Sequence, residues 1–222
     1  MGYNIAVDGP AGAGKSTIAK LVAKEKGYIY VDTGAMYRAM ALFLIRKGVS
    51  PQDSAAISET CREADITIRY ENGEQVVLLN GENVNGLIRT EEVGNMASKS
   101  SANPDVRAKL LELQRKLAAD SDVIMDGRDI GTCVLPDATV KIYLTASSAI
   151  RAKRRYEELK AKGEVCDFET IEADIIQRDH QDMTREIAPL KQAEDAVLLD
   201  SSGMTIEEVA EEIKRICREK GC

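Results

Sequence analysis

The sequence lacks the features of a membrane, secreted or nucleic-acid-binding protein. It has no run of eighteen apolar residues, and its first residues lack the charged-then-apolar pattern of a secretion signal. Lysine and arginine number 30 against 37 aspartates and glutamates, which makes the formal net charge −7. Nucleic acids and anionic membranes are therefore not the expected partners. We expect a cytoplasmic protein, and anionic small molecules stay possible ligands because a few well-placed arginines suffice to hold them.

Cysteine frameworks and histidine-based catalytic centres are also missing. The five cysteines are odd in number and have no close-paired spacing, so we expect neither a disulfide framework nor a zinc site. The one histidine, His180, lies in a charged helical stretch and is expected on the solvated surface. No Ser-His-Asp arrangement, metal-ligand cluster or nucleophilic cysteine is visible. Chemistry that depends on positioned charges rather than on a nucleophilic side chain therefore remains.

One glycine-rich stretch carries the strongest signal. It follows the pattern Gly-x-x-x-x-Gly-Lys-Ser/Thr, and it lies between an apolar strand at 3–7 and a helical pattern from Ile18 onward. Glycines allow successive N–H groups to point at phosphate oxygens, and the helix N-terminus adds about half a positive charge. Lys15 is expected to reach the β- and γ-phosphates, and the Ser16 hydroxyl to ligate Mg²⁺. The predicted ATP-binding residues are Gly9, Pro10, Ala11, Gly12, Ala13, Gly14, Lys15, Ser16 and Thr17.

Strand and helix signals alternate along most of the chain. Strand, helix and strand within the first thirty residues predict a right-handed crossover onto a parallel sheet. Further strands are expected at 123–126, 139–144 and 195–200, and helices at 32–48, 53–64, 147–162, 167–186 and 205–220, with another starting at Asn103-Pro104. Thr205 and Glu208 are expected to form a capping box at the start of the helix at 205–220. The fold class is therefore α/β, a doubly wound parallel sheet with helices on both faces.

A β-hairpin interrupts this alternation. Ile66, Ile68 and Tyr70 alternate with polar residues, a turn containing Asn72-Gly73 follows, and an apolar run at 76–79 completes the pair. We interpret the hairpin as part of a small inserted subdomain that extends to about residue 101.

A second polar cluster, Asp126-Gly127-Arg128-Asp129, comes at the end of a buried strand. Ligands in doubly wound sheets lie outside that edge, beside the first βα turn. Asp126 is thus placed to hold a Mg²⁺-bound water and Arg128 to face a phosphate. A turn with a surface ion pair is the alternative, and the phosphate loop favours the functional interpretation. Cys133, a little further on, is expected to pack within a strand.

Arginines form the third signal. Five of them lie near predicted element ends, where the planar guanidinium suits bidentate phosphate recognition, but spacing alone does not separate them from solvated arginines: Arg38, Arg107, Arg128, Arg178 and Arg185. Arg151, Arg154 and Arg155 share one helical face. Two interpretations fit that face: a basic flap over a triphosphate, or a solvated face paired with Glu157 and Glu158.

With these motifs in place, the sequence resembles the bacterial cytidylate kinases, of the nucleoside monophosphate kinase group of P-loop proteins, over nearly its whole length. The 126–138 run is specific to that family, whereas the phosphate loop is not. The matching stretches are 9–17, 32–38, 88–93, 126–138, 178–179, 182–185, 188–190 and 197–201.

The resemblance implies in-line transfer of the γ-phosphoryl group of MgATP to CMP or dCMP, in pyrimidine nucleotide metabolism, by a monomer. It also implies a kinase core at 1–35 and 103–222 with a helical lid at about 151–165, and a monophosphate-binding region at 36–102 that contains the hairpin. The rivals are a P-loop kinase for UMP, AMP or a shikimate-like acceptor, and a regulatory P-loop NTPase. The sequence has no Asn-Lys-x-Asp guanine-reading motif, which counts against a switch protein.

Roles for single residues follow from the resemblance by position. Arg38 and Arg128 would hold the acceptor phosphate, and Lys15, Arg128 and Arg154 would neutralise the transferring group. Those expected to face the cytosine are Thr33, Arg107, Asp129 and Arg185, and those expected to contact the sugar are Ser98, Arg178 and Asp182. Mg²⁺ would be held by Ser16 and, through water, by Asp126.

Overall fold

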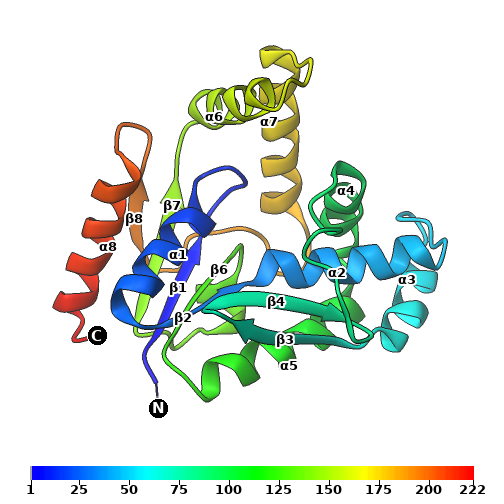
Figure 1. Cartoon of the computed structure of the whole chain (residues 1–222), viewed down its shortest axis with the longest axis horizontal. Coiled ribbons are helices and arrows are strands. Elements are labelled where there is room, and N and C mark those ends of the chain that lie inside the picture. Colours follow the sequence, from blue (N-terminus) through cyan, green and yellow to red (C-terminus); the bar gives the residue numbers. More distant parts are fainter. Residues whose placement is uncertain (1) are drawn as a thin grey trace. The chain divides into compact units, whose positions relative to one another are not determined.

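The computed structural model describes residues 2–222, which form two compact units. We call residues 3–28 and 124–222 the P-loop unit, and residues 29–123 with Gly2 the hairpin unit. Figure 1 shows the elements in chain order.

The main sheet has five strands in the order β2-β6-β1-β7-β8. β1 pairs with β7 and β7 with β8, both in parallel, so that Val7 lies opposite Ile142 and Leu144 opposite Leu199. Because β6 and β7 flank β1, the loops that follow β1 and β6 leave the same edge of the sheet side by side. The expected α/β class with a parallel sheet is confirmed. The strands are β1 (Asn4–Asp8), β2 (Ile29–Asp32), β6 (Val123–Gly127), β7 (Val140–Thr145) and β8 (Val197–Asp200).

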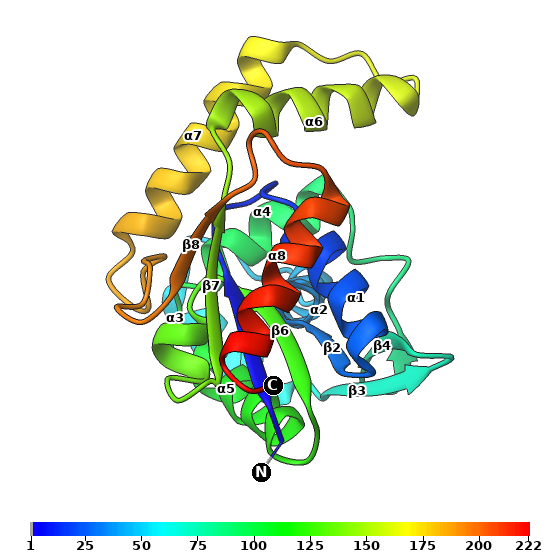
Figure 2. The same ribbon diagram turned by 90° about the vertical axis from the view of Figure 1, so that its left-hand side faces the viewer.

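The helices of the P-loop unit form two packed pairs. Helix α8 (Ile206–Glu219) buries Val209, Ile213 and Ile216 and packs beside α1 (Lys15–Lys26), as Figure 2 shows. Helix α6 (Ser148–Ala161) packs against α7 (Phe168–Thr184). The predicted capping box between Thr205 and Glu208 is present at the start of α8.

The hairpin unit contains a three-stranded antiparallel sheet. Ile68 lies opposite Val77, and the turn between them places Asn72 and Gly73 at φ 53° and 80°, the conformation of a type I′ turn. The predicted hairpin is therefore confirmed. The unit contains β3 (Ile66–Glu71), β4 (Glu74–Leu79), β5 (Glu82–Asn83), α2 (Thr33–Arg46), α3 (Ser54–Thr60), η1 (Cys61–Glu63), α4 (Glu91–Ser100) and α5 (Pro104–Ala119).

Two elements differ from the sequence-based expectation. Helix α4, capped by Thr90, lies in a stretch for which no helix was assigned. Cys133 is not in a strand, so that prediction was wrong: residues Ile130–Val134 form a π-helix, η2, in which Val134 N–H bonds to the Asp129 carbonyl at 3.2 Å. π-Helical turns are rare in proteins as a whole, but those that do occur are often found at functional sites. Within residues 2–222 no helix is long and apolar enough to cross a membrane.

Candidate active site

The glycine-rich loop joins β1 to α1 with backbone angles that only glycine adopts easily. Gly9 and Gly14 have φ of 147° and 90°. A Cβ on Gly9 would lie 1.9 Å from the Leu144 carbonyl oxygen, so no side chain fits there. Gly14 is the N-cap of α1 and supplies no side-chain hydrogen bond. The first N–H groups of α1 therefore keep the geometry of an anion site.

Lys15 lies buried inside this loop. Its Nζ donates a hydrogen bond to the Pro10 carbonyl at 2.8 Å. Burial lowers the pKa of the ammonium to about 7, with the Arg128 charge as the second cause, whereas Asp126 and Asp8 act in the opposite direction. A cation with so little solvation is ready to accept an anionic partner.

Ser16 and Asp126 meet at the edge of the sheet. The Ser16 hydroxyl, in the first turn of α1, donates to Asp126 Oδ2 at 2.8 Å, and Asp126 is buried near the end of β6. A hydroxyl and a carboxylate are hard oxygen ligands of the kind that Mg²⁺ uses alongside waters and substrate phosphates. The donor set therefore fits Mg²⁺. Within residues 2–222 no group of three or more His, Cys, Asp or Glu could hold a metal by itself.

The predicted phosphate arginine, Arg128, is held by α7. Its Nε donates to Asp182 Oδ2 at 2.9 Å. Burial alone would raise the pKa of Asp182, but the charges of Arg128, Arg178 and Arg185 together lower it. The buried Nε of Arg178 has no hydrogen-bond partner among the described residues, and burial followed by the Arg128 charge lowers its pKa. Arg128, Arg178 and Asp182 thus form one cluster, in which the Arg178 Nε–H is a donor without a partner among the described residues.

Asp129 and Arg185 form a second pair in the P-loop unit. Asp129 Oδ1 lies 3.6 Å from Arg185 Nη2, and both side chains are buried. Arg185 Nε donates to the Ala188 carbonyl at 2.7 Å, and Ala188 has a positive φ of 48°, which costs energy for a residue with a Cβ. The chain after α7 is therefore bent so that it fixes this guanidinium.

The three arginines of α6 have different environments. Arg155 pairs with Glu158 at 2.9 Å on the surface, as the solvated alternative expected. Arg154 Nη2 donates to the Ser201 carbonyl at 3.0 Å, and its Nη1 lies 4.0 Å from the place of a Cβ on Gly14. Arg154 therefore lies beside the phosphate loop.

Arg151 is buried and ties three segments of the P-loop unit together. It donates to the Ala146 carbonyl at 2.9 Å and to the Ala11 carbonyl at 3.0 Å, and it makes a two-pronged ion pair with Asp179 at 3.1 and 2.5 Å. The Arg151 guanidinium thus links α6, the phosphate loop and α7. It is structural support for the loop, which the sequence did not reveal.

The remaining predicted residues lie in the hairpin unit. Arg38 donates to the Ile88 carbonyl at 3.3 Å, and Arg107 donates to the Ser101 carbonyl at 3.3 Å. Thr33 is buried at the start of α2, and Ser98 is half-buried on α4, which packs against α2. The predicted acceptor-binding residues therefore fall into two groups. Those in the hairpin unit are Thr33, Arg38, Ser98 and Arg107, and those in the P-loop unit are Arg128, Asp129, Arg178, Asp182 and Arg185.

The chain is similar to one known family along nearly its whole length. A family model described as cytidylate kinase matches residues 5–219. The chain belongs to the cytidylate kinase family. It is 52% identical to the cytidylate kinase of Geobacter sp. (strain M21) over 99% of this chain and 94% of that protein. It is 51% identical to the cytidylate kinase of Caldicellulosiruptor bescii over 95% and 93%. An uncharacterized protein from Eubacterium ventriosum has a similar fold, with a TM-score of 0.54 at 11% identity over 97% of this chain and 98% of that one.

Membership of the family confirms the resemblance found in the motifs, and it identifies a kinase. Sequence reasoning missed one buried carboxylate of the P-loop unit, that of Asp8. Asp8 is buried at the end of β1, and its two oxygens accept the N–H groups of Ile130 and Gly131, each at 2.7 Å. Burial raises the pKa of Asp8 to about 6 although both hydrogen bonds act to lower it. The sequence did contain one signal for Asp8, because an acidic residue stands directly before Gly9, the first glycine of the loop.

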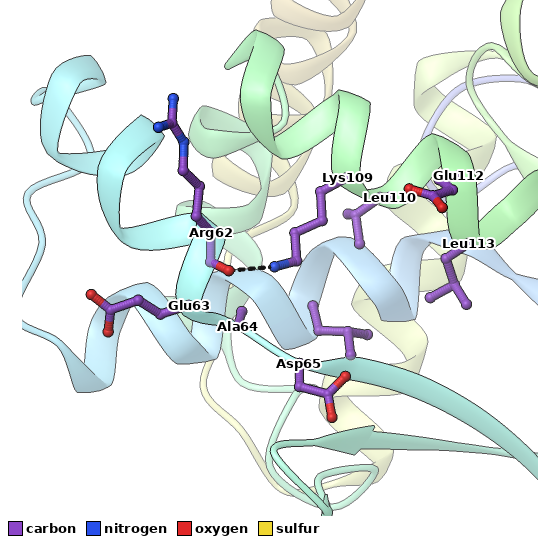
Figure 3. A pocket seen from close by; sticks show the side chains of 9 residues that line it. Arg62, Glu63, Ala64, Asp65, Lys109, Leu110, Glu112 and Leu113 are labelled. Carbon is purple, nitrogen blue, oxygen red and sulfur yellow. Dashed lines mark hydrogen bonds between the residues drawn. The ribbon is translucent and has the colours of Figure 1, made fainter.

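A pocket of about 470 Å³ in the hairpin unit contains none of the predicted site residues. Figure 3 shows it between the η1–β3 connection and α5, with the Lys109 ammonium donating to the Arg62 carbonyl at 2.7 Å. Its lining carries both charges: Arg62 and Lys109 are basic, and Glu63, Asp65 and Glu112 are acidic. We assign it no part in the family's chemistry, because neither a phosphate-binding loop nor an oriented arginine pair faces it.

Proposed function

We propose that this kinase transfers the γ-phosphoryl group of MgATP to CMP or dCMP, giving ADP and CDP or dCDP. The observation that carries the choice of acceptor is the match to the cytidylate kinase family, with relatives of that name about half identical over nearly the full chain. The protein acts in pyrimidine nucleotide metabolism as a cytoplasmic monomer. Its net charge of −7 supports small nucleotides rather than nucleic acid or membrane as partners.

The donor triphosphate binds along the loop from Gly9 to Thr17. The loop N–H groups hold its phosphate oxygens, and the Lys15 ammonium exchanges the Pro10 carbonyl for a phosphate oxygen. Ser16 and, through water, Asp126 would hold Mg²⁺, which would supply neutralisation of the phosphate charge. Arg154, beside Gly14, is placed to neutralise charge on the transferring group. No strong general base is needed, because the acceptor phosphate is already ionised.

The acceptor's phosphate is held by Arg38 and Arg128. Asp182 aligns the Arg128 guanidinium through its Nε, so that the remaining nitrogens face the phosphate. The Asp129–Arg185 pair sets an acceptor beside a donor, which matches the amino group and ring nitrogen of cytosine. Thr33 and Arg107 complete the base site, and Ser98, Arg178 and Asp182 contact the sugar. The unpartnered Arg178 Nε supports this role.

The two-substrate scheme includes closure. Residues 36–102 act as the monophosphate-binding region and about 151–165 as the lid, moving over the core formed by 1–35 and 103–222. Closure excludes water, which would otherwise accept the phosphoryl group from ATP.

An acceptor-specificity assay tests the proposal. ADP formation is followed with MgATP and each of CMP, dCMP, UMP, AMP and shikimate, with the Lys15→Met variant as the blank for contaminating kinases. We expect the highest kcat/KM with CMP or dCMP. Preference for AMP would overturn the cytosine assignment, and ATP hydrolysis without stimulation by any acceptor would favour a regulatory NTPase.

A further inference from the structure

Helix α8 ends in a Schellman motif that joins two cysteines. The Cys222 N–H donates to the Cys217 carbonyl at 3.0 Å, and the Gly221 N–H donates to the Arg218 carbonyl at 3.2 Å. Gly221 has the positive φ of 80° that the motif requires. In this motif the residues at the two ends of the longer hydrogen bond commonly bring their side chains into contact. Here both of those side chains are thiols.

The two thiols have unequal access to solvent. Cys217 is completely buried on the face of α8 that also buries Ile213 and Ile216, whereas Cys222 is only half-buried. Both are reduced in the structure. Burial, and then the neighbouring Cys222, raise the pKa of the Cys217 thiol to about 12. Cys222 is therefore the thiol that an outside reagent meets first.

We propose that Cys217 and Cys222 form a redox-active dithiol site that reacts with low-molecular-weight disulfides of the glutathione type and closes to an intramolecular disulfide. The Cys222 thiolate attacks one sulfur of the small disulfide. The disulfide's S–S bond breaks, a mixed disulfide forms on Cys222, and the first small thiol leaves with the proton that Cys222 released.

The second step uses the buried partner. Cys217 gives its proton to solvent and attacks the Cys222 sulfur, and the second small thiol leaves with a proton taken from solvent. In sum, two cysteine thiols are oxidised to one disulfide while one small disulfide is reduced to two thiols. The mixed disulfide carries no thiolate, so the Cys222 charge no longer opposes ionisation of Cys217.

Peptide mapping of the full-length chain tests the site. Reduced protein is incubated with excess oxidised glutathione, quenched with an alkylating agent and digested with trypsin without reduction. Arg218 and Lys220 lie between the two cysteines, so trypsin separates them and a disulfide appears directly as a linked pair of peptides, 216–218 with 221–222. We expect this pair to accumulate with time, and the apparent Tm of the oxidised chain to rise because the crosslink restricts the unfolded state.

Single variants separate the two steps. Cys217→Ser is expected to stop at a glutathione adduct on Cys222, and Cys222→Ser to leave Cys217 unmodified. The matched control is Cys166→Ser, since Cys166 is also half-buried but contacts the Tyr156 carbonyl, and it should leave the linked pair unchanged.

Three results on the wild-type chain would overturn the proposal, whether or not the variants fold. The first is a persistent glutathione adduct on Cys222 with no linked pair. The second is faster oxidation at Cys133 or Cys166 than at Cys222. The third is linkage found only between separate chains, seen as covalent dimers on a non-reducing gel.

Discussion

The carboxylate of Asp8 accepts the backbone N–H of Gly131 at 2.7 Å, across 123 positions of the chain. Its other oxygen holds the neighbouring N–H of Ile130 at the same distance. Asp8 ends the strand that leads into the phosphate loop, and the π-helix that it caps directly follows Asp129. One buried carboxylate therefore connects the strand that leads into the glycine-rich loop to the segment that follows Arg128 and Asp129.

We predict that Asp8→Asn changes the pH dependence of stability. The raised pKa of Asp8, about 6 against 3.8, means that the folded protein binds a proton more tightly than the unfolded chain between those values. This contribution to stability is present below pH 3.8 and is lost as pH rises through about 6. The wild type should therefore lose stability from pH 4 to 6 relative to the variant, by on the order of 2–3 kcal/mol.

Urea unfolding followed by circular dichroism measures this difference, because the chain has no tryptophan for fluorescence. At pH 7 the variant is also expected to have lower kcat/KM. The NH₂ group of the asparagine is a donor and would face a backbone N–H, which is also a donor, so one of the two hydrogen bonds is lost. The control is Asp137→Asn, which changes an exposed aspartate. Parallel pH profiles for wild type and Asp8→Asn would contradict the prediction.

Lys15→Met should separate catalysis from folding. Loss of the phosphate-facing cation is expected to reduce turnover by about 10²–10³ or more, in the range found when one transition-state donor is removed. The lowered pKa of Lys15 shows that burial disfavours its charge, so a methionine of similar length should leave the unfolding midpoint equal or higher. Steady-state ADP formation and urea unfolding give the two readouts. Near-normal turnover would refute the proposed donor site.

Asp126→Asn should lower the apparent affinity of the enzyme for Mg²⁺. The asparagine can still accept from the Ser16 hydroxyl but carries no charge for a Mg²⁺-bound water. The Mg²⁺ concentration that gives half-maximal rate is expected to rise about 10–100-fold, the range seen for outer-sphere partners of metals. Initial rates at fixed ATP across a Mg²⁺ titration measure it, with Asp137→Asn as the control. An unchanged midpoint would remove Asp126 from the metal site.

Arg128→Lys should raise the KM for CMP by about 10–100-fold, because charge-assisted hydrogen bonds are worth about 1.5–3 kcal/mol and lysine cannot bind Asp182 and a phosphate in the same fork geometry. The KM for ATP is expected to change little. Arg155→Lys is the matched control, since Arg155 forms only an exposed pair with Glu158. A larger effect on ATP than on CMP would place Arg128 on the donor side.

Local features of the fold could be predicted from the sequence because their causes lie within a few residues. The strand, glycine turn and helix around Lys15, the Asn72-Gly73 hairpin turn and the Thr205 capping box all form as expected. Helix α4 was missed although Thr90 caps it, because the hairpin signal before it suggested a continuing irregular insert. The family resemblance then gave candidate roles to residues such as Arg107, whose spacing alone was uninformative.

Only the tertiary structure decided which side chain meets which partner. Arg151 and Arg155 share a helical face in the sequence, yet one is buried against Asp179 and the other lies in solvent. The π-helix after Asp129 depends on Asp8, more than a hundred residues earlier. Hydrogen bonds between distant segments depend on how parallel strands align at one sheet edge, and no local propensity encodes that alignment. The chemistry could therefore be predicted from the sequence, whereas the positions of the supporting residues came from the packing.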